Sequence, residues 1–170
     1  MRGILFDHHG KSLTQKQELY QATYMENRVE QDPADWENAL YSIIRQVTEE
    51  AGKMNEEIGA ISITSQRSSV IPVDEKIQPL SNAIMWQDKR TNHLCEMLEN
   101  LNDKVFSLCG SRVNPVFSAS KMTWIREERP EIYEKTYKFM VIPDYLIYLM
   151  TGNLYTDYTY GSRSLSLIHI

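Results

Sequence analysis

Asn82 to Thr91 read NAIMWQDKRT: three apolar residues lead into a tryptophan, and an amide, an acid and two bases follow at once. The apolar run predicts a short strand over Ala83 to Trp86. A strand in a protein core usually gives way to turn residues such as Gly, Asn or Pro. This one ends in side chains that can donate and accept many hydrogen bonds, which indicates a place to hold a polar ligand.

A second polar cluster follows another predicted strand. Ile58 to Thr64 read IGAISIT and are rich in β-branched residues, as strands are, and Ser65 to Ser69 come directly after them. In open α/β sheets, ligands bind beyond the carboxyl ends of the strands. Gln66 and Arg67 would supply directional donors there, and Trp86 a flat apolar face. A sugar or polyol needs both, because its hydroxyls want hydrogen bonds and its C–H face packs on an aromatic ring.

The same residues also have a purely structural interpretation, which the sequence leaves open. Asp88 and Arg90 can cap the following helix and pair with each other. Trp86 can belong to the core, and Arg67 can take part in a surface ion pair.

The rest of the pattern predicts an α/β domain with a mixed sheet flanked by helices. Asp32-Pro33 is a strong helix start, and the apolar stripe that follows recurs at helical spacing until Gly52 ends the helix. The stripe consists of Trp36, Leu40, Ile43, Ile44 and Val47. Further strands are predicted over 2–7 and 69–73, a hairpin turn over 8–12, and helices over 91–99, 103–109, 118–128 and 143–150.

Composition excludes several classes of protein. Of the 170 residues 42% are hydrophobic and 24% charged, and the net charge is −5, which argues for a folded domain and against a nucleic-acid binder with a basic face. No apolar run approaches the ~20 residues that span a bilayer. His8 and His9 would point to opposite faces of a strand, so we predict no metal site. Cys95 and Cys109 are too far apart for a CxxC motif, and we expect reduced thiols near a helical core and a cytoplasmic protein.

Seven segments, taken in order, resemble the FGGY family of carbohydrate kinases, most closely its glycerol kinase branch. They are RGILFD (2–7), VEQDPADW (29–36), IGAISITSQR (58–67), NAIMWQDKRT (82–91), NPVFSASKMTWI (114–125), PDYLIYLMTG (143–152) and TDYTYGSRSL (156–165). Each segment is a weak signal alone, and seven in series are specific.

The resemblance implies an actin-like, ribonuclease H-like fold and an ATP-dependent phosphotransferase. In the family, a sugar or polyol binds in the first of two domains, MgATP binds mainly through the second, and a carboxylate takes the proton from the attacking hydroxyl. Residues 1–170 correspond to part of the amino-terminal domain, so we expect a chain truncated at both ends. The first strand, the Asp-x-Gly-Thr phosphate loop and the catalytic Asp would lie outside it, and the chain alone would be inactive. The resemblance also allows a homodimer in the parent protein.

Family roles can be carried over residue by residue. Arg2 resembles the Arg near the nucleotide phosphates, Arg67 the Arg that hydrogen-bonds substrate hydroxyls, and Trp86 the Trp that lines the substrate pocket. Residues that support this site without touching the substrate would be Gln66, Asp88 and Arg90.

Two departures from glycerol kinases affect the expected substrate. Ser68 stands where they carry Glu, and Val116 stands where they carry Tyr, so a charged acceptor and a phenol hydroxyl are both absent from the substrate-binding set. A site built to bond particular hydroxyls discriminates by up to ~10⁴-fold. Glycerol is therefore no better an expectation than another sugar or polyol. Tyr160-Gly161 also replaces the family's usual Asn-Ala.

The last six residues have two interpretations. LSLIHI (165–170) is what a transposon end used in sequencing libraries encodes, so we interpret it as an adapter-derived tail, the alternative being a native strand.

The predicted function also has an alternative: instead of a kinase, the chain would be a non-catalytic, actin-like sugar-binding or regulatory module. A ribonuclease H-like nuclease would need clustered carboxylates and a basic face, and the sequence offers neither.

Overall fold

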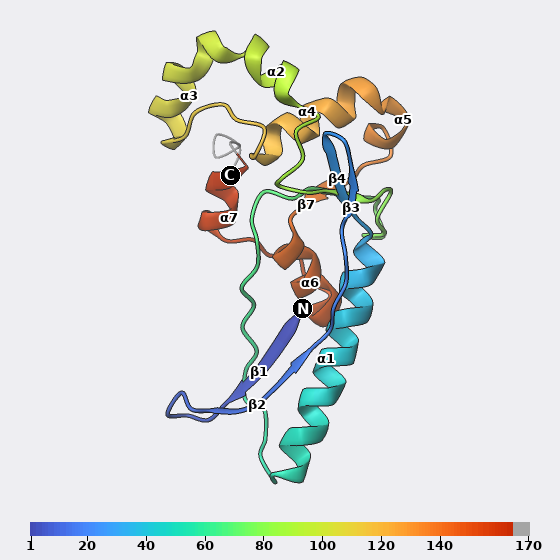
Figure 1. Cartoon of the computed structure of the whole chain (residues 1–170), viewed down its shortest axis with the longest axis vertical. Helices are drawn as coiled ribbons and strands as arrows, with labels where there is room; N and C mark the ends of the chain where they lie inside the picture. The colour runs from blue at the N-terminus through green and yellow to red at the C-terminus, as the bar shows by residue number, and fades with distance from the viewer. Residues whose placement is uncertain (165–170) are drawn as a thin grey trace. The chain divides into compact units, whose positions relative to one another are not determined.

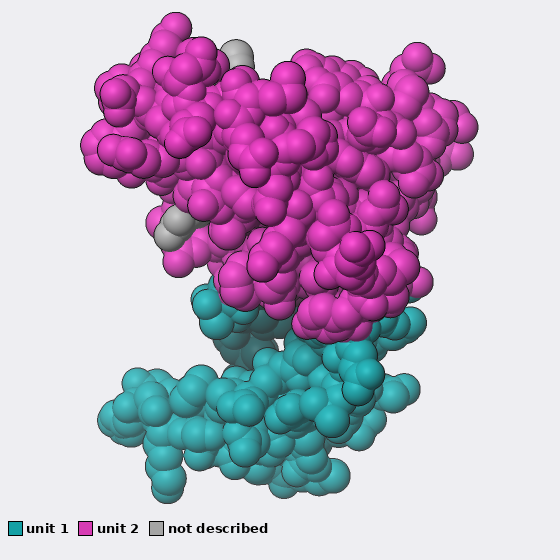
Figure 2. All heavy atoms as spheres, turned by 45° about the horizontal axis from the view of Figure 1, so that its top comes forward, with its two compact units in different colours: residues 1–21, 34–64 teal, residues 22–33, 65–170 magenta. Residues whose placement is uncertain are grey.

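The computed structural model describes residues 1–164, and this part of the chain divides into two compact units (Figure 2). Unit 1 comprises residues 1–21 and 34–64, and unit 2 comprises residues 22–33 and the chain from Ser65 onward. The interpreted tail, residues 165–170, lies outside the described residues.

Unit 1 consists of a β-hairpin and a long helix (Figure 1). β1 (Arg2–Phe6) pairs antiparallel with β2 (Ser12–Gln17), and Gly10 in the turn between them has a φ of 81°. The strand predicted over 2–7 and the hairpin turn predicted over 8–12 are therefore confirmed. α1 (Pro33–Lys53) begins at the predicted proline and continues through Gly52 to Lys53, one residue further than the glycine predicts.

The apolar stripe of α1 provides the core of unit 1. Trp36, Leu40 and Ile43 are buried, and Ile44 and Val47 are half-buried. Residues three and four apart share one face of a helix, so these side chains cover the same side. Trp36 is 1% exposed, so it belongs to the core, as its place in the apolar stripe predicts.

The hairpin approaches α1 most closely at Gly3. A Cβ atom at Gly3 would overlap Cγ2 of Ile43, so only glycine lets β1 lie this close to the helix. Just beyond β2, the Glu18 carboxylate accepts hydrogen bonds from Ser42 Oγ at 2.7 Å and from Gln46 Nε2 at 2.8 Å. The hairpin is thus joined to the helix by both close packing and polar contacts.

The strand predicted at Ile58 to Thr64 is not formed in the described residues. This segment has no strand assignment, and Ile61 is 61% exposed. β-branched residues favour a strand, but a strand also needs a neighbour for its N–H and C=O groups. β1 and β2 pair only with each other, and neither of the other two sheets includes this segment.

Unit 2 contains two small sheets. One has the strand order β3 (Thr23–Met25), β4 (Arg28–Gln31), β6 (Ala83–Ile84), and the other pairs β5 (Ile71–Val73) with β7 (Lys138–Met140). The predicted strands over 69–73 and 83–86 are therefore present in shortened form. An antiparallel bridge between Val70 and Ile84, with N···O distances of 3.0 Å in both directions, links the two sheets.

Every strand pairing in the described part of the chain is antiparallel, and the strands fall into three small sheets. This corrects the expectation of one mixed sheet. A parallel pair would need a segment such as Ile58–Thr64 to join a sheet, and that segment has no partner strand.

The helices of unit 2 surround a small apolar core. They are α2 (Asn92–Met97), the 3₁₀ helix η1 (Glu99–Leu101), α3 (Asn102–Cys109), α4 (Ser118–Glu128), α5 (Pro130–Tyr133), α6 (Ile142–Thr151) and α7 (Tyr158–Arg163). The four helices predicted after residue 90 are present, and α4 has the predicted bounds. One core cluster brings together Val70, Ile84, Leu94, Trp124 and Ile125. Cys95 and Cys109 are both free and half-buried within helices.

Candidate functional site

The polar segment before Val70 and the polar segment after Ile84 meet at one end of the bridge between these two residues. Trp86 donates its backbone N–H to Ser69 Oγ at 3.2 Å and its indole N–H to Gln66 Oε1 at 2.8 Å. The sequence pattern predicted that both segments lie at the carboxyl ends of strands. The antiparallel bridge instead joins the start of one strand to the end of its neighbour, and it brings the same side chains together.

Trp86 combines a fixed orientation with an open surface. Its indole N–H is held by Gln66, yet 39% of the residue remains exposed. An aromatic ring that is tethered at its polar edge and open elsewhere suits the C–H face of a polyol.

Arg67 and Ser68, two predicted substrate contacts, lie in opposite environments. Arg67 is exposed, whereas Ser68 is 3% exposed and has a φ of 71°. A left-handed conformation is uncommon for a residue other than glycine, and it turns the chain sharply at this point. Arg67 is therefore free to reach a ligand, and Ser68 has little surface to offer one.

α7 contributes Asp157, which sequence reasoning missed, and Tyr160, which the sequence analysis singled out. Asp157 caps this helix by accepting the N–H groups of Thr159 at 2.7 Å and Tyr160 at 3.0 Å. The bond from the Thr159 hydroxyl is the main reason that the pKa of Asp157 lies below its ordinary value, and the charge of Arg67 contributes to this lowering. Tyr160 donates its hydroxyl to the Ser65 carbonyl at 3.5 Å, a long bond. Tyr160, which stands where the resemblance leads us to expect Asn, therefore lies beside the segment that carries Arg67.

The turn at residues 114–117 presents Val116, the other predicted substrate contact. Val116 is 36% exposed, and its N–H donates to Asn114 Oδ1 at 2.9 Å. The N–H of Phe117 donates to the Asn114 carbonyl at 3.1 Å, which closes the turn.

Lys121 lies beneath this turn and was not predicted as part of the site. Its side chain is fully buried, and its Nζ donates to the carbonyls of Pro115 at 2.6 Å, Val116 at 2.8 Å and Phe117 at 3.3 Å. Burial lowers the pKa of Lys121 to about 8. The buried face of α4 also holds Ser118 and Ser120, so no apolar stripe in the sequence marked Lys121 as a buried residue.

Hydrogen bonds connect α4 to its neighbours in the site. Thr91, at the end of the Trp86 segment, donates its hydroxyl to Ser120 Oγ at 3.0 Å, and both residues are buried. The N–H of Ala119 donates to the Ser164 carbonyl at 3.1 Å, just after α7. The Trp86 segment and α7 are therefore both attached to the first turn of α4.

Asp88 and Arg90 form a buried ion pair behind the Trp86 segment. Asp88 accepts the Val29 N–H at 2.6 Å and the Arg90 guanidinium at 2.9 and 2.8 Å. Arg90 also pairs with Glu30 at 2.7 Å, and its guanidinium carbon lies 4.7 Å from the centre of the Trp124 ring. These contacts join β4, the Trp86 segment and α4, and they show that Asp88 and Arg90 pair with each other, as the structural interpretation predicted.

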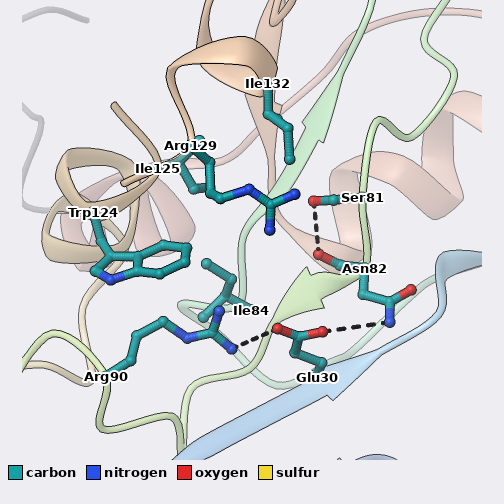
Figure 3. Close-up of a pocket in the computed structure, with 9 residues that line it drawn as sticks. All are labelled: Glu30, Ser81, Asn82, Ile84, Arg90, Trp124, Ile125, Arg129 and Ile132. Carbon is teal, nitrogen blue, oxygen red and sulfur yellow. Dashed lines mark hydrogen bonds and ion pairs between the residues drawn. The ribbon is translucent and has the colours of Figure 1, made fainter. Parts of the chain in front are cut away.

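A small pocket lies next to this ion pair, away from the residues predicted to bind substrate (Figure 3). Its volume is about 50 Å³, which is room for one or two water molecules and too little for a sugar. Figure 3 shows Glu30 bonded to Arg90 on one side and to Asn82 on the other. The pocket is lined by Glu30, Ser81, Asn82, Ile84, Arg90, Trp124, Ile125, Arg129 and Ile132.

Asp144, in the first turn of α6, is a further residue that sequence reasoning missed. The pKa of this carboxyl is raised to about 6, mainly because it is buried; a hydrogen bond with Thr156 opposes the rise, and the charge of Asp157 adds to it. A carboxyl group with such a pKa changes charge close to neutral pH.

The remaining predictions concern Arg2, metals and membranes. Arg2 lies exposed on β1 in unit 1. Residues 1–164 contain no group of three or more His, Cys, Asp or Glu side chains arranged to hold a metal ion. Within the same residues, no helix has both the length and the apolar character required to cross a membrane.

Comparison with curated proteins returns sugar and polyol kinases. The xylulose kinase of Lactococcus lactis is 30% identical over 169 residues, which are 98% of this chain and 34% of that protein. The glycerol kinase of Thermoanaerobacter is 35% identical over 174 residues, 96% of this chain and 35% of that protein. The chain thus spans about a third of the length of these relatives.

The solved structures that this chain resembles are kinases as well. The gluconate kinase of Lactobacillus acidophilus matches with a TM-score of 0.90 at 26% identity, over 96% of this chain and 33% of that one. The glycerol kinase of Plasmodium falciparum, solved with ADP, matches with a TM-score of 0.90 at 28% identity, over 96% of this chain and 35% of that one. The α/β fold of the actin-like sugar kinases is therefore confirmed.

The N-terminal domain of the FGGY family of carbohydrate kinases matches residues 1–167, which is nearly the whole chain. With the likeness in sequence and in fold, this shows that the chain belongs to the FGGY family of carbohydrate kinases and corresponds to its N-terminal domain.

Proposed function

We propose that this chain is the substrate-binding part of an ATP-dependent kinase that phosphorylates a hydroxyl of a sugar or polyol. The carrying observation is Trp86, whose ring is tethered through its N–H to Gln66 while 39% of the residue stays exposed. Exposed Arg67 follows Gln66 directly and supplies donors for hydroxyl groups. Family membership supports the assignment of both residues to the acceptor site.

The acceptor would pack its C–H face on Trp86 and accept hydrogen bonds from Arg67. This holds the attacking hydroxyl in one orientation, which accounts for much of catalysis in phosphoryl transfer. The base that takes its proton and the residues that position ATP would come from the rest of the kinase. We propose that Arg2 lies near the phosphates, and the phosphate loop expected before Arg2 stays a prediction.

Mg²⁺ accompanies ATP in phosphoryl transfer and neutralises charge on the phosphates. Residues 1–164 contain no group of three or more His, Cys, Asp or Glu side chains that could hold a metal ion, and we assign Mg²⁺ to no residue of this chain.

The acceptor is proposed to be a sugar or polyol other than glycerol. Val116 offers an apolar surface that is 36% exposed, and it cannot hydrogen-bond a hydroxyl as a tyrosine would. Ser68 is neither charged nor accessible, being 3% exposed. The relatives include xylulose kinases as well as glycerol kinases, so D-xylulose is the first candidate.

The test is steady-state kinetics of the whole kinase that contains this chain, with D-xylulose, gluconate and glycerol as acceptors. We expect Trp86→Ala to raise the acceptor KM at least ~10-fold, because aromatic contact and positioning are lost together, with the KM for ATP changed less than ~2-fold. Trp86→Phe keeps an apolar face and lacks the bond to Gln66, so its effect should be intermediate.

Tyr137→Ala is the matched control. Tyr137 is an aromatic residue of the same unit, 54% exposed, and its side chain contacts Lys138 instead of the site. Its substitution should leave both KM values unchanged. An acceptor KM that Trp86→Ala does not alter would refute the site. Acceptor binding without turnover by the whole protein would favour the non-catalytic sugar-binding module.

A further inference from the structure

Lys121 differs from the other cations of unit 2 in how it is bonded. Its side chain is fully buried, and its ammonium group donates to three successive backbone carbonyls, those of Pro115, Val116 and Phe117. An ammonium group has three donors, so this set of carbonyls uses all of them. Burying a charge is costly unless such partners compensate, so this contact constrains the turn strongly.

The turn depends on this lysine for its shape. Three carbonyl oxygens that converge on one point repel one another, and the ammonium group between them removes that repulsion. Asn114 holds the other side of the turn by accepting the N–H of Val116 on its side chain and that of Phe117 on its carbonyl. Val116 is thereby left as the exposed tip of a constrained turn.

The base of the turn is anchored to the rest of the site. Ser120 donates its hydroxyl to the Phe117 carbonyl at 3.1 Å and accepts the Thr91 hydroxyl at 3.0 Å. Trp124 and Ile125 hold the same helix in the core cluster. The helix that carries Lys121 is therefore fixed, and loss of the lysine would release the turn and leave the helix in place.

We infer that Lys121 is a positioning residue: it holds the turn at residues 114–117 so that Val116 stands at a fixed place beside the acceptor. This rests on the proposed function, because it needs Val116 to face the acceptor sugar. The lysine itself touches no substrate, and it acts through the three carbonyls that it bonds.

The first test is the kinetics of Lys121→Met in the whole kinase, with D-xylulose and glycerol as acceptors. Methionine keeps much of the side chain's length and removes all three donors. We expect the acceptor KM to rise about 10-fold and the KM for ATP to change less than ~2-fold, because only the acceptor side of the site loses its shape. Ile125→Val, a milder change in the same helix, is the control for lost stability and should leave both KM values unchanged.

The second test is amide hydrogen exchange of the same variants. In Lys121→Met, peptides covering residues 113–119 should exchange at least ~10-fold faster, while peptides of α6 keep their protection. Should Lys121→Met fail to fold, Ser120→Ala decides: it removes one bond to the Phe117 carbonyl and should raise both the exchange rate of the turn and the acceptor KM by a smaller factor.

The outcomes separate this inference from the proposed function. Unchanged acceptor KM and unchanged exchange in these variants would overturn the role of Lys121, whatever happens to stability. Faster exchange with an unchanged acceptor KM would overturn it as well, because the turn would then not shape the site. If Trp86→Ala also leaves the acceptor KM unchanged, the proposed site itself fails.

Discussion

The carboxylate of Asp88 accepts four hydrogen bonds while only 1% of the residue is exposed. The donors are the N–H groups of Val29 and Arg90 and two nitrogens of the Arg90 guanidinium, at 2.6 to 2.9 Å. Removing one partner of a buried pair leaves a charge uncompensated. We expect Asp88→Asn to lower the free energy of unfolding by about 3 kcal/mol, measured by urea denaturation.

An exposed ion pair provides the control for this prediction. Arg126 and Glu127 are 3.3 Å apart with side chains 56% and 44% exposed, so Glu127→Gln should change the free energy of unfolding by less than ~0.5 kcal/mol. Equal effects of Asp88→Asn and Glu127→Gln would show that the buried network contributes nothing beyond a surface pair.

Asp144 should make stability depend on pH in the direction opposite to that of an ordinary carboxylate. Burial raises its pKa from 3.8 to about 6, so between these values the folded chain holds a proton that the unfolded chain has lost. The contribution of Asp144 to stability is therefore complete below pH 3.8 and falls as pH rises through 6. Since the group is partly exposed, the loss is on the order of 1 kcal/mol.

The variant Asp144→Asn tests this sign. Asparagine keeps an oxygen for Thr156 and carries no charge, so the variant should gain stability relative to the native chain as pH rises from about 4 to about 7. Urea denaturation at several pH values in this range measures the difference. A difference that does not vary with pH would contradict the raised pKa.

At the scale of the elements, the end of α6 depends on a left-handed glycine. Gly152 has a φ of 70°, and its N–H donates to the Tyr148 carbonyl at 2.8 Å. A Cβ at this position would meet no atom within 4 Å, so the cost of a side chain is conformational alone. We expect Gly152→Ala to destabilise the chain by about 1 kcal/mol in a thermal or urea melt.

Gly52 is the matched control, since it lies in the last turn of α1 without a positive φ, and a Cβ there would also meet no atom within 4 Å. Alanine at this position should stabilise by about 0.5 kcal/mol because it favours the helix. If both substitutions changed the stability in the same direction, the left-handed conformation would not be the reason that position 152 needs glycine.

At the scale of the whole molecule, the chain spans about a third of the length of its relatives. Its described residues supply a tethered aromatic ring, an exposed arginine and a constrained turn, all of which belong to the acceptor side of the proposed site. We therefore expect the 170-residue chain alone to produce no ADP from ATP and D-xylulose, and the longer kinase that contains it to do so. A coupled ADP assay of both proteins measures this. Acceptor-dependent turnover by the 170-residue chain would contradict the proposal.

The sequence by itself determined the family, most of the helices and the pair of segments that form the candidate site. Helical periodicity and helix-end residues are local, so α1, α4 and α6 could be predicted from neighbouring residues. The family was recognisable because seven spaced segments occur in order over nearly the whole chain.

Only the tertiary structure decided which strands pair and which side chains support the site. A strand needs a partner that is distant in sequence, so β-branched Ile58–Thr64 stayed unpaired, and Gln66 met Trp86 across an antiparallel bridge instead of at the ends of parallel strands. The roles of Lys121 and Asp144 likewise depend on burial. Burial is set by residues far along the chain, so no local pattern reveals it.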